Sequence, residues 1–320
     1  MKYLVNNCTD AQWNMAHDEF LLEQMPGMVF CLWQNGPSVI VGQNQSVYAE
    51  VNLPYLQEHG IMLARRVTGG GAVYHDLGNL NYSIAGPMEQ MEDALDLVPA
   101  ALRRMGASVE RSGRNDLMLN GRKCSGYAKR MSRDRVMIHG TLMWDVKLEE
   151  LTQALAVPGS KLEAAGIASV RSRVTNLKDA LPQFRDIGSF KAALQQELAQ
   201  GDPEISITPD QLASINRMAD EKFRSWDWIY GRSPATGFKA SRKFGCGTVE
   251  AGWTVEHGCM ARLSFTGDFM GNLPSDTLCA GLEGCRFEKP AVLDALKKSP
   301  EPVCSYFDGL VAEDLLSLFF

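Results

Sequence analysis

The sequence predicts an α+β protein in which a mixed or largely antiparallel sheet packs against helices. Hairpins and helices are mixed along the chain instead of following one another in βαβ order. The clearest single signal is Asn120-Gly121 between two strand-like runs, since this pair favours the tight turn of an antiparallel hairpin. A length of 320 residues suggests two domains, because single domains usually run to about 100–200 residues.

The elements expected before this hairpin begin with a helix. Thr9-Asp10-Ala11-Gln12 has the form of a capping box, and helical residues continue to about Met25. The Asn35-Gly36-Pro37 turn joins two short strands. In order, we expect strands at 28–33 and 38–41, a short helix at 54–59, strands at 62–67, 72–75 and 80–84, and a helix at 89–105 that Gly106 ends.

The later elements include the hairpin strands 116–119 and 122–125 and a strand at 136–143. Helices are expected near 148–155, 189–200 and 210–226. Turn residues after Trp228 predict a domain boundary, which we place between residues 235 and 236. The second domain should hold two or three strands within 247–265 and helices at 291–297 and 311–319.

Charge and cysteine content narrow the class of protein. The net charge is −6, yet residues 103–135 carry ten Lys and Arg against three acids, which suggests either an anionic ligand or a solvated face. An acidic chain without a nucleic-acid-binding motif predicts no nucleic-acid partner. No apolar run is long enough for a membrane helix. Eight scattered cysteines without a C-x-x-C pair favour reduced thiols in a cytoplasm.

Four segments are candidates for chemistry. In one of them, 166–177, Arg171 and Arg173 share a face if the segment is extended, and they could close over an anionic ligand or only decorate the surface. Arg65-Arg66 precedes Gly69-Gly70-Gly71, whose backbone N–H groups can surround a phosphate or carboxylate, although a flexible hairpin loop is the simpler alternative. Lys123 follows the tight turn and can stabilise negative charge, or else is an exposed strand lysine. His139 lies in a strand beside Gly140, and a lone histidine there is more often structural.

Together these segments resemble the signature of the lipoate–protein ligase family. The matching runs occur in the family's order over residues 1–235: they are 65–76 with 78–83, 113–116, 121–128, 139–142 and 166–177. The remainder, 236–320, resembles the family's smaller accessory domain. The resemblance implies the fold shared with biotin ligases and class II aminoacyl-tRNA synthetases.

The resemblance also implies a two-step reaction. ATP and lipoate give lipoyl-adenylate and pyrophosphate with Mg²⁺, and a lysine of an acceptor lipoyl domain then attacks the adenylate. The acceptors would be lipoyl domains of 2-oxo acid dehydrogenase complexes or the glycine-cleavage H protein. A transferase that uses preformed adenylate, and a paralogue that only binds lipoyl domains, remain alternatives.

The residue roles implied by the resemblance centre on Lys123, which would contact the lipoate carboxylate and the α-phosphate during catalysis. The residues that would bind ATP or the adenylate are Arg66, Gly70, Gly71, Ala72, Val73, Tyr74, Asn79 and Lys123. The lipoate pocket would comprise Arg66, His75, Lys123, His139 and Gly140, with Asp116 as metal ligand. Arg171 and Arg173 would belong to a loop that closes over the adenylate.

Cys124 departs from the family's pattern, in which the residue after this lysine is usually apolar. Octanoyltransferases of the same superfamily form an acyl-thioester on a cysteine and use no ATP, so Cys124 admits this rival. Strand alternation turns Cys124 away from the face of Lys123, which favours the ligase.

Overall fold

The computed structural model describes residues 1–113, 115–155 and 173–320. The chain divides into two compact units, each described below by itself. The first comprises residues 1–45 and 50–225, and the second comprises residues 46–49 and 226–320.

The first unit is built on an eight-stranded mixed sheet with strand order β11-β1-β2-β6-β10-β9-β8-β7. Neighbours from β2 to β7 are antiparallel, whereas β1 is parallel to both β2 and β11. The α+β prediction is therefore confirmed. The strands are β1 (Lys2–Leu4), β2 (Val29–Trp33), β6 (Asn79–Pro87), β7 (Val109–Ser112), β8 (Asp116–Leu119), β9 (Arg122–Ser132), β10 (Arg135–Met143) and β11 (Glu204–Ile205).

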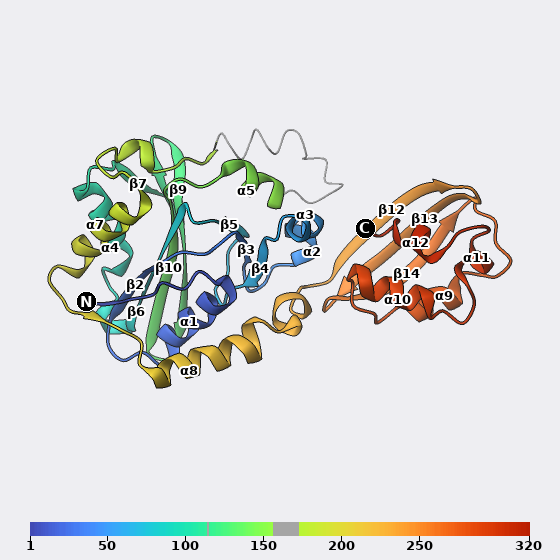
Figure 1. Ribbon diagram of the computed structural model, residues 1–320, viewed down its shortest axis with the longest axis horizontal. Coiled ribbons are helices and arrows are strands. Elements are labelled where there is room, and N and C mark those ends of the chain that lie inside the picture. Colours follow the sequence, from blue (N-terminus) through green and yellow to red (C-terminus); the bar gives the residue numbers. More distant parts are fainter. Residues whose placement is uncertain (114, 156–172) are drawn as a thin grey trace. The chain divides into compact units, whose positions relative to one another are not determined.

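The two faces of this sheet have different neighbours (Figure 1). One face packs against α4 (Ala94–Arg104) and α7 (Ile187–Ala199), and Tyr82 and Ile84 of β6 belong to that apolar core. Because side chains alternate along a strand, Asn81 and Ser83 point to the opposite face, where α1 (Ala11–Glu23) contacts β6 and β10. The polar face of the sheet is thus the one that can carry a site.

A second, three-stranded sheet holds β3 (Ser38–Val41), which is parallel to β4 (Met62–Arg65) and antiparallel to β5 (Val73–His75). The strands expected at 28–33 and 38–41 therefore fall in different sheets and do not pair through their turn. The remaining helices of the first unit are α3 (Leu53–Glu58), α5 (Leu148–Ala154) and α8 (Pro209–Met218), the 3-10 helices η1 (Met88–Gln90) and η2 (Lys178–Ala180), and the π-helix η3 (Ala219–Phe223). Helix α2 (Val47–Glu50) has only its last residue in the first unit.

Local sequence signals explain several element ends. Asn120 and Gly121 have φ of 51° and 76°, which confirms the tight turn between β8 and β9. The side chain of Asp10, rather than Thr9, caps α1 by accepting from the backbone of Gln12 and Trp13. The edge strands β7 and β11, and β1 beside β11, were not expected from the sequence, because runs of two to four residues are too short to show a strand period.

The second unit contains an antiparallel sheet, β12-β13-β14, covered by helices. Trp253 stacks on Phe238 at 5.4 Å and meets Phe319 edge-on at 5.1 Å between ring centroids, which fixes an aromatic core. Its elements are η4 (Asp227–Gly231), β12 (Thr236–Phe244), β13 (Gly247–Glu256), β14 (Cys259–Gly267), α9 (Asp276–Leu282), α10 (Lys289–Lys297), α11 (Val303–Tyr306) and α12 (Ala312–Leu316). Among the described residues of the chain, no helix has the length and apolar character needed to cross a membrane.

Candidate active site

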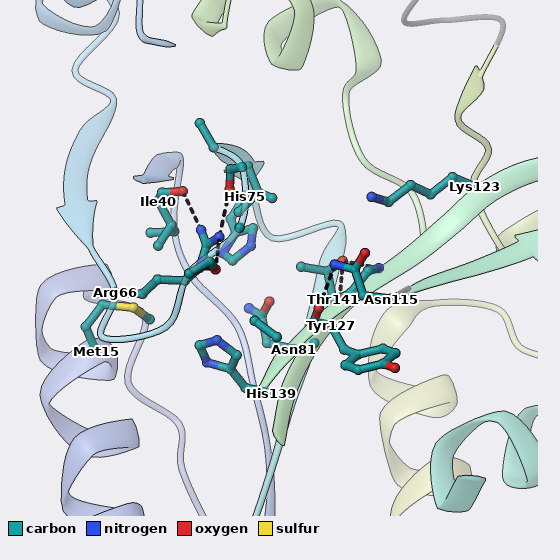
Figure 2. A pocket seen from close by; sticks show the side chains of 18 of the residues that line it. Met15, Ile40, Arg66, His75, Asn81, Asn115, Lys123, Tyr127, His139 and Thr141 are labelled. Atoms are coloured by element: carbon teal, nitrogen blue, oxygen red, sulfur yellow. Dashed lines mark hydrogen bonds between the residues drawn. The ribbon is translucent and has the colours of Figure 1, made fainter. Parts of the chain in front are cut away.

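A cavity of about 160 Å³ opens on the polar face of the large sheet, within the first unit. Residues from β2, β6, β9 and β10 line it, together with β3, β5, α1 and the glycine triplet. Figure 2 shows Lys123 approaching from one side, with Arg66, Met15 and His139 on the opposite side. The topology therefore brings together segments that are far apart in the sequence.

Most of the predicted site residues meet at this cavity: Arg66, Gly70, Gly71, Ala72, Val73, His75, Lys123, His139 and Gly140 all line it. Tyr74, Asn79 and Asp116 do not. Tyr74 alternates with Val73 and His75 along β5, so its side chain takes the other face. Sequence reasoning missed Asn81 and Thr141, although each is two residues from a predicted site residue on the same strand. Met15, Trp33 and Ile40 carry no such signal.

Lys123 is held at its tip by an ion pair. Its Nζ lies 2.7 Å from Oδ1 of Asp116, and both side chains are about one-third exposed, at 39% and 34%. Gly126 makes room for this pair, because a Cβ there would lie 3.1 Å from Lys123 Nζ. The carboxylate of Asp116 thus contacts Lys123. The metal-ligand role expected for Asp116 stays a prediction.

Arg66 is buried and donates to main-chain carbonyls. Nη2 donates to Gly69 and Gly71 at 2.8 Å each, and Nη1 donates to Ile40 at 3.0 Å. Burial lowers the pKa of this guanidinium to about 10. The glycine triplet therefore curls around the arginine.

The loop also needs close backbone contact with Gly42. A Cβ on Gly42 would lie 2.1 Å from the carbonyl oxygen of Gly70. Gly70 itself has φ of 95°, in the region that favours glycine. Gly42 and Gly70 therefore let two backbone segments touch, which holds the loop in place.

His139 belongs to a hydrogen-bond network that anchors α1 to the sheet. Its Nδ1 lies 2.6 Å from Oδ2 of buried Asp18, and its Nε2 lies 2.8 Å from Thr68 Oγ1. Ser83 donates to the other oxygen of Asp18. Gly140 faces the opposite side of β10, where a Cβ would lie 2.5 Å from the Tyr82 ring. His139 and Gly140 therefore both have a structural role in addition to lining the cavity.

Cys124 belongs to the apolar core and does not line the cavity. It is fully buried, and its thiol contacts the carbonyl of Leu117 at 3.4 Å. Burial raises the pKa of this thiol to about 12, so a thiolate is disfavoured. The position of Cys124 argues against an acyl-thioester at this residue.

The predicted basic loop lies largely outside the described residues. Arg171 falls within 156–172, whereas Arg173 is described and exposed. Arg114, in the matching run 113–116, also lies outside the described residues. Within the part of the chain that the structure describes, no group of three or more His, Cys, Asp or Glu side chains could hold a metal ion.

Comparisons with known proteins agree on one family. The model of the lipoyl protein ligase A/B catalytic domain matches residues 10–199, and that of the bacterial lipoate protein ligase C-terminus matches 233–319. The chain is 33% identical to lipoate-protein ligase LplJ of Bacillus subtilis over 98% of both chains.

Solved structures give the same result for the fold. A bipartite lipoate protein ligase of Thermoplasma acidophilum, described with its E2 lipoyl domain, aligns with a TM-score of 0.66 and 27% identity over 72% of this chain and 96% of that one. A lipoate-protein ligase A bound with ATP aligns with a TM-score of 0.63 and 26% identity, over 72% of this chain and 98% of that one. The chain belongs to the lipoate–protein ligase family.

Proposed function

We propose that this protein is an ATP-dependent lipoate–protein ligase that forms lipoyl-adenylate and transfers the lipoyl group to a lysine of an acceptor lipoyl domain. The observation that carries the proposal is one cavity that joins Lys123, the glycine triplet and a mainly apolar slot. ATP bound to a related ligase, and the E2 lipoyl domain described with another, support two of the three substrates, ATP and the acceptor domain.

The first step brings two anions together. An oxygen of the lipoate carboxylate attacks the α-phosphorus of ATP, and pyrophosphate leaves. Lys123 Nζ would offset the charge that builds on the carboxylate and α-phosphate, and the backbone N–H groups of Gly70 and Gly71 would bind phosphate oxygens. Arg66, whose guanidinium holds the loop carbonyls, would shape this site and add positive charge beside it.

In the second step the amine of the acceptor lysine attacks the acyl carbon, and AMP leaves. Lys123 would stay beside the carbonyl oxygen as negative charge develops there. Ala72 and Val73, which line the cavity, would border the nucleotide, and His75, His139 and Gly140 would border lipoate. Tyr74 and Asn79 do not line the cavity, and a contact of theirs to the nucleotide is proposed from the resemblance alone.

Magnesium is part of this proposal. Proteins commonly hold Mg²⁺ with one or two carboxylates plus substrate phosphates, and partly exposed Asp116 beside Lys123 fits that need. When bound, Mg²⁺ would neutralise charge on the phosphates of ATP.

We further propose that residues 1–235 form the catalytic domain and 236–320 an accessory domain, since the cavity lies within the first unit. The acceptors would be lipoyl domains of 2-oxo acid dehydrogenase complexes or the glycine-cleavage H protein. The protein would be located in the cytoplasm.

Adenylation is tested by lipoate-dependent pyrophosphate release from ATP, with purified protein, Mg²⁺ and no acceptor. We expect release by the wild type and by Cys124→Ala, and release at least about 10²-fold slower by Lys123→Ala. No release by the wild type, with transfer only from preformed adenylate, would show a transferase instead.

A further inference from the structure

Two buried nitrogens in the cavity wall lack a hydrogen-bond partner among the described residues. They are Nε2 of His75 and Nδ2 of Asn81. The two side chains are 3% and 1% exposed, and both residues line the cavity. Buried polar atoms normally have a hydrogen-bond partner. Two buried nitrogens without one, both at a ligand cavity, suggest that the ligand supplies the missing acceptors.

Both nitrogens are donors. Asn79 donates to Oδ1 of Asn81 at 2.9 Å, which leaves the amide N–H groups of Asn81 for the cavity. Asn79 is thus a positioning residue for Asn81. For His75, Asn35 donates to Nδ1 at 3.0 Å, and burial lowers the pKa of the imidazole to about 3, so the single proton sits on Nε2.

The orientation of Asn35 is itself fixed by Asn14. The amide nitrogen of Asn14 contacts the carbonyl oxygens of Cys8 and Gln34, which can only accept. The same nitrogen donates to Oδ1 of Asn35 at 2.8 Å, so the amide nitrogen of Asn35 must face His75. The chain of amides therefore determines which nitrogen of His75 carries the proton.

These donors lie toward the far end of the cavity from Lys123. Lys123 Nζ lies over Gly126, whose N–H donates to Thr141. Thr141 pairs with Asn81 across β10 and β6, and Asn81 pairs with Trp33 across β6 and β2. Two strand spacings separate Gly126 from Asn81, about 10 Å.

His75 approaches the same end from the small sheet. Its ring meets Trp33 edge-on, with 6.4 Å between centroids. Figure 2 shows His75 and Asn81 on the side of the cavity away from the base of Lys123.

We propose that Asn81 and His75 recognise the dithiolane sulfurs of lipoate and make the protein prefer lipoate over octanoate. This inference rests on the proposed function. With its carboxyl group at Lys123, an extended eight-carbon chain ends near Asn81, and the sulfurs of lipoate sit on its sixth and eighth carbons. Sulfur is a weak acceptor, whereas the methylene and methyl groups of octanoate accept nothing. A site with fixed donors disfavours the ligand that leaves them unpaired.

The test compares lipoate with octanoate, which matches its chain length and carboxyl group. Dissociation constants are measured by calorimetry without ATP, and kcat/KM by pyrophosphate release with ATP. We expect the wild type to favour lipoate in both. Asn81→Leu removes the donor at similar volume. It should lower the preference for lipoate over octanoate, measured as the ratio of their kcat/KM values and of their affinities, about fivefold to tenfold. Asn81→Ala is the second variant, and circular dichroism verifies that each folds.

Met15→Leu is the matched control, because it alters the apolar wall of the same cavity without touching a donor. It should change the constants for both ligands by the same factor. Equal losses for both ligands in Asn81→Leu and Asn81→Ala would overturn the inference while leaving the ligase function intact. A wild type that binds neither acid would instead overturn the proposed function itself.

Discussion

Arg66 and Lys123 are two cations on one cavity, and they are held in opposite ways. Arg66 is 7% exposed and donates to the carbonyls of Ile40, Gly69 and Gly71. Lys123 is more than one-third exposed at its side chain and has one ion pair, to Asp116. A buried cation with several main-chain partners cannot move without breaking the loop, whereas a lysine held by one exposed partner can exchange it for a substrate.

The difference teaches that similar predicted roles separate once burial is known. Arg66 builds the wall of the site, and Lys123 is free to act on the reacting atoms. Variants at the two positions should therefore fail in different assays.

The largest effect is expected at Lys123. Lys123→Ala should lower kcat for pyrophosphate release about 10²- to 10³-fold, the usual result of removing one donor to a developing anion. Its thermal midpoint should stay within about 1 °C of the wild type, because a partly exposed ion pair adds little stability. Calorimetry measures the thermal midpoint, and the pyrophosphate-release assay measures kcat. A large loss of stability in Lys123→Ala would contradict the contrast drawn between Lys123 and Arg66.

Arg66→Ala should lose stability first. Its removal takes away the donors to the buried carbonyl of Ile40 and to the carbonyls of Gly69 and Gly71, which costs about 1–3 kcal/mol of unfolding free energy. Urea denaturation measures this loss. Arg66→Lys should not restore it, because one ammonium cannot reach all these carbonyls. An Arg66→Ala protein as stable as the wild type would show that Arg66 is not structural.

Two glycines of the same loop region provide a matched pair. Gly42→Ala should raise KM for ATP about tenfold, because its Cβ would displace the Gly70 carbonyl and cost roughly 1–3 kcal/mol. Gly69→Ala should change KM less than twofold, since no atom lies within 4 Å of its added Cβ. Equal effects of the two substitutions would contradict the role given to the Gly42–Gly70 contact.

The smallest effect is expected at His17. This residue does not line the cavity, so it tests the effect of burial alone. Both ring nitrogens of this fully buried side chain are unpaired among the described residues, and burial lowers its pKa to about 4. Between about pH 6.5 and 4 the unfolded chain takes up a proton at His17 that the folded chain does not. The free energy of unfolding therefore decreases as the pH is lowered through this range. The slope is about 1.4 kcal/mol per pH unit.

His17→Phe should reduce this acid-dependent loss and raise stability at pH 7 by about 1 kcal/mol. Urea denaturation at pH 7 and pH 5 measures both. An unchanged slope between these two pH values would show that His17 does not titrate on unfolding.

Sequence patterns predicted the parts of the site that follow a strand period or a glycine run. The hairpin around Asn120 placed Lys123, and alternation placed Cys124 away from it, as the structure confirms. Asn81 was missed because the resemblance assigned roles to Asn79 and His139 only, and a strand period does not show which polar side chains meet a cavity. The partners of Arg66 were out of reach, since the main-chain carbonyls of Ile40 in another strand and of Gly69 and Gly71 in its own loop carry no sequence signature.

The most direct test of the account is the intact mass of an apo lipoyl domain after incubation with this protein, lipoate and Mg²⁺-ATP. We expect one lipoyl group to be added by the wild type and by Cys124→Ala, only in the presence of ATP, and none by Lys123→Ala. Addition without ATP from an acyl-thioester donor, or its loss in Cys124→Ala, would contradict the account.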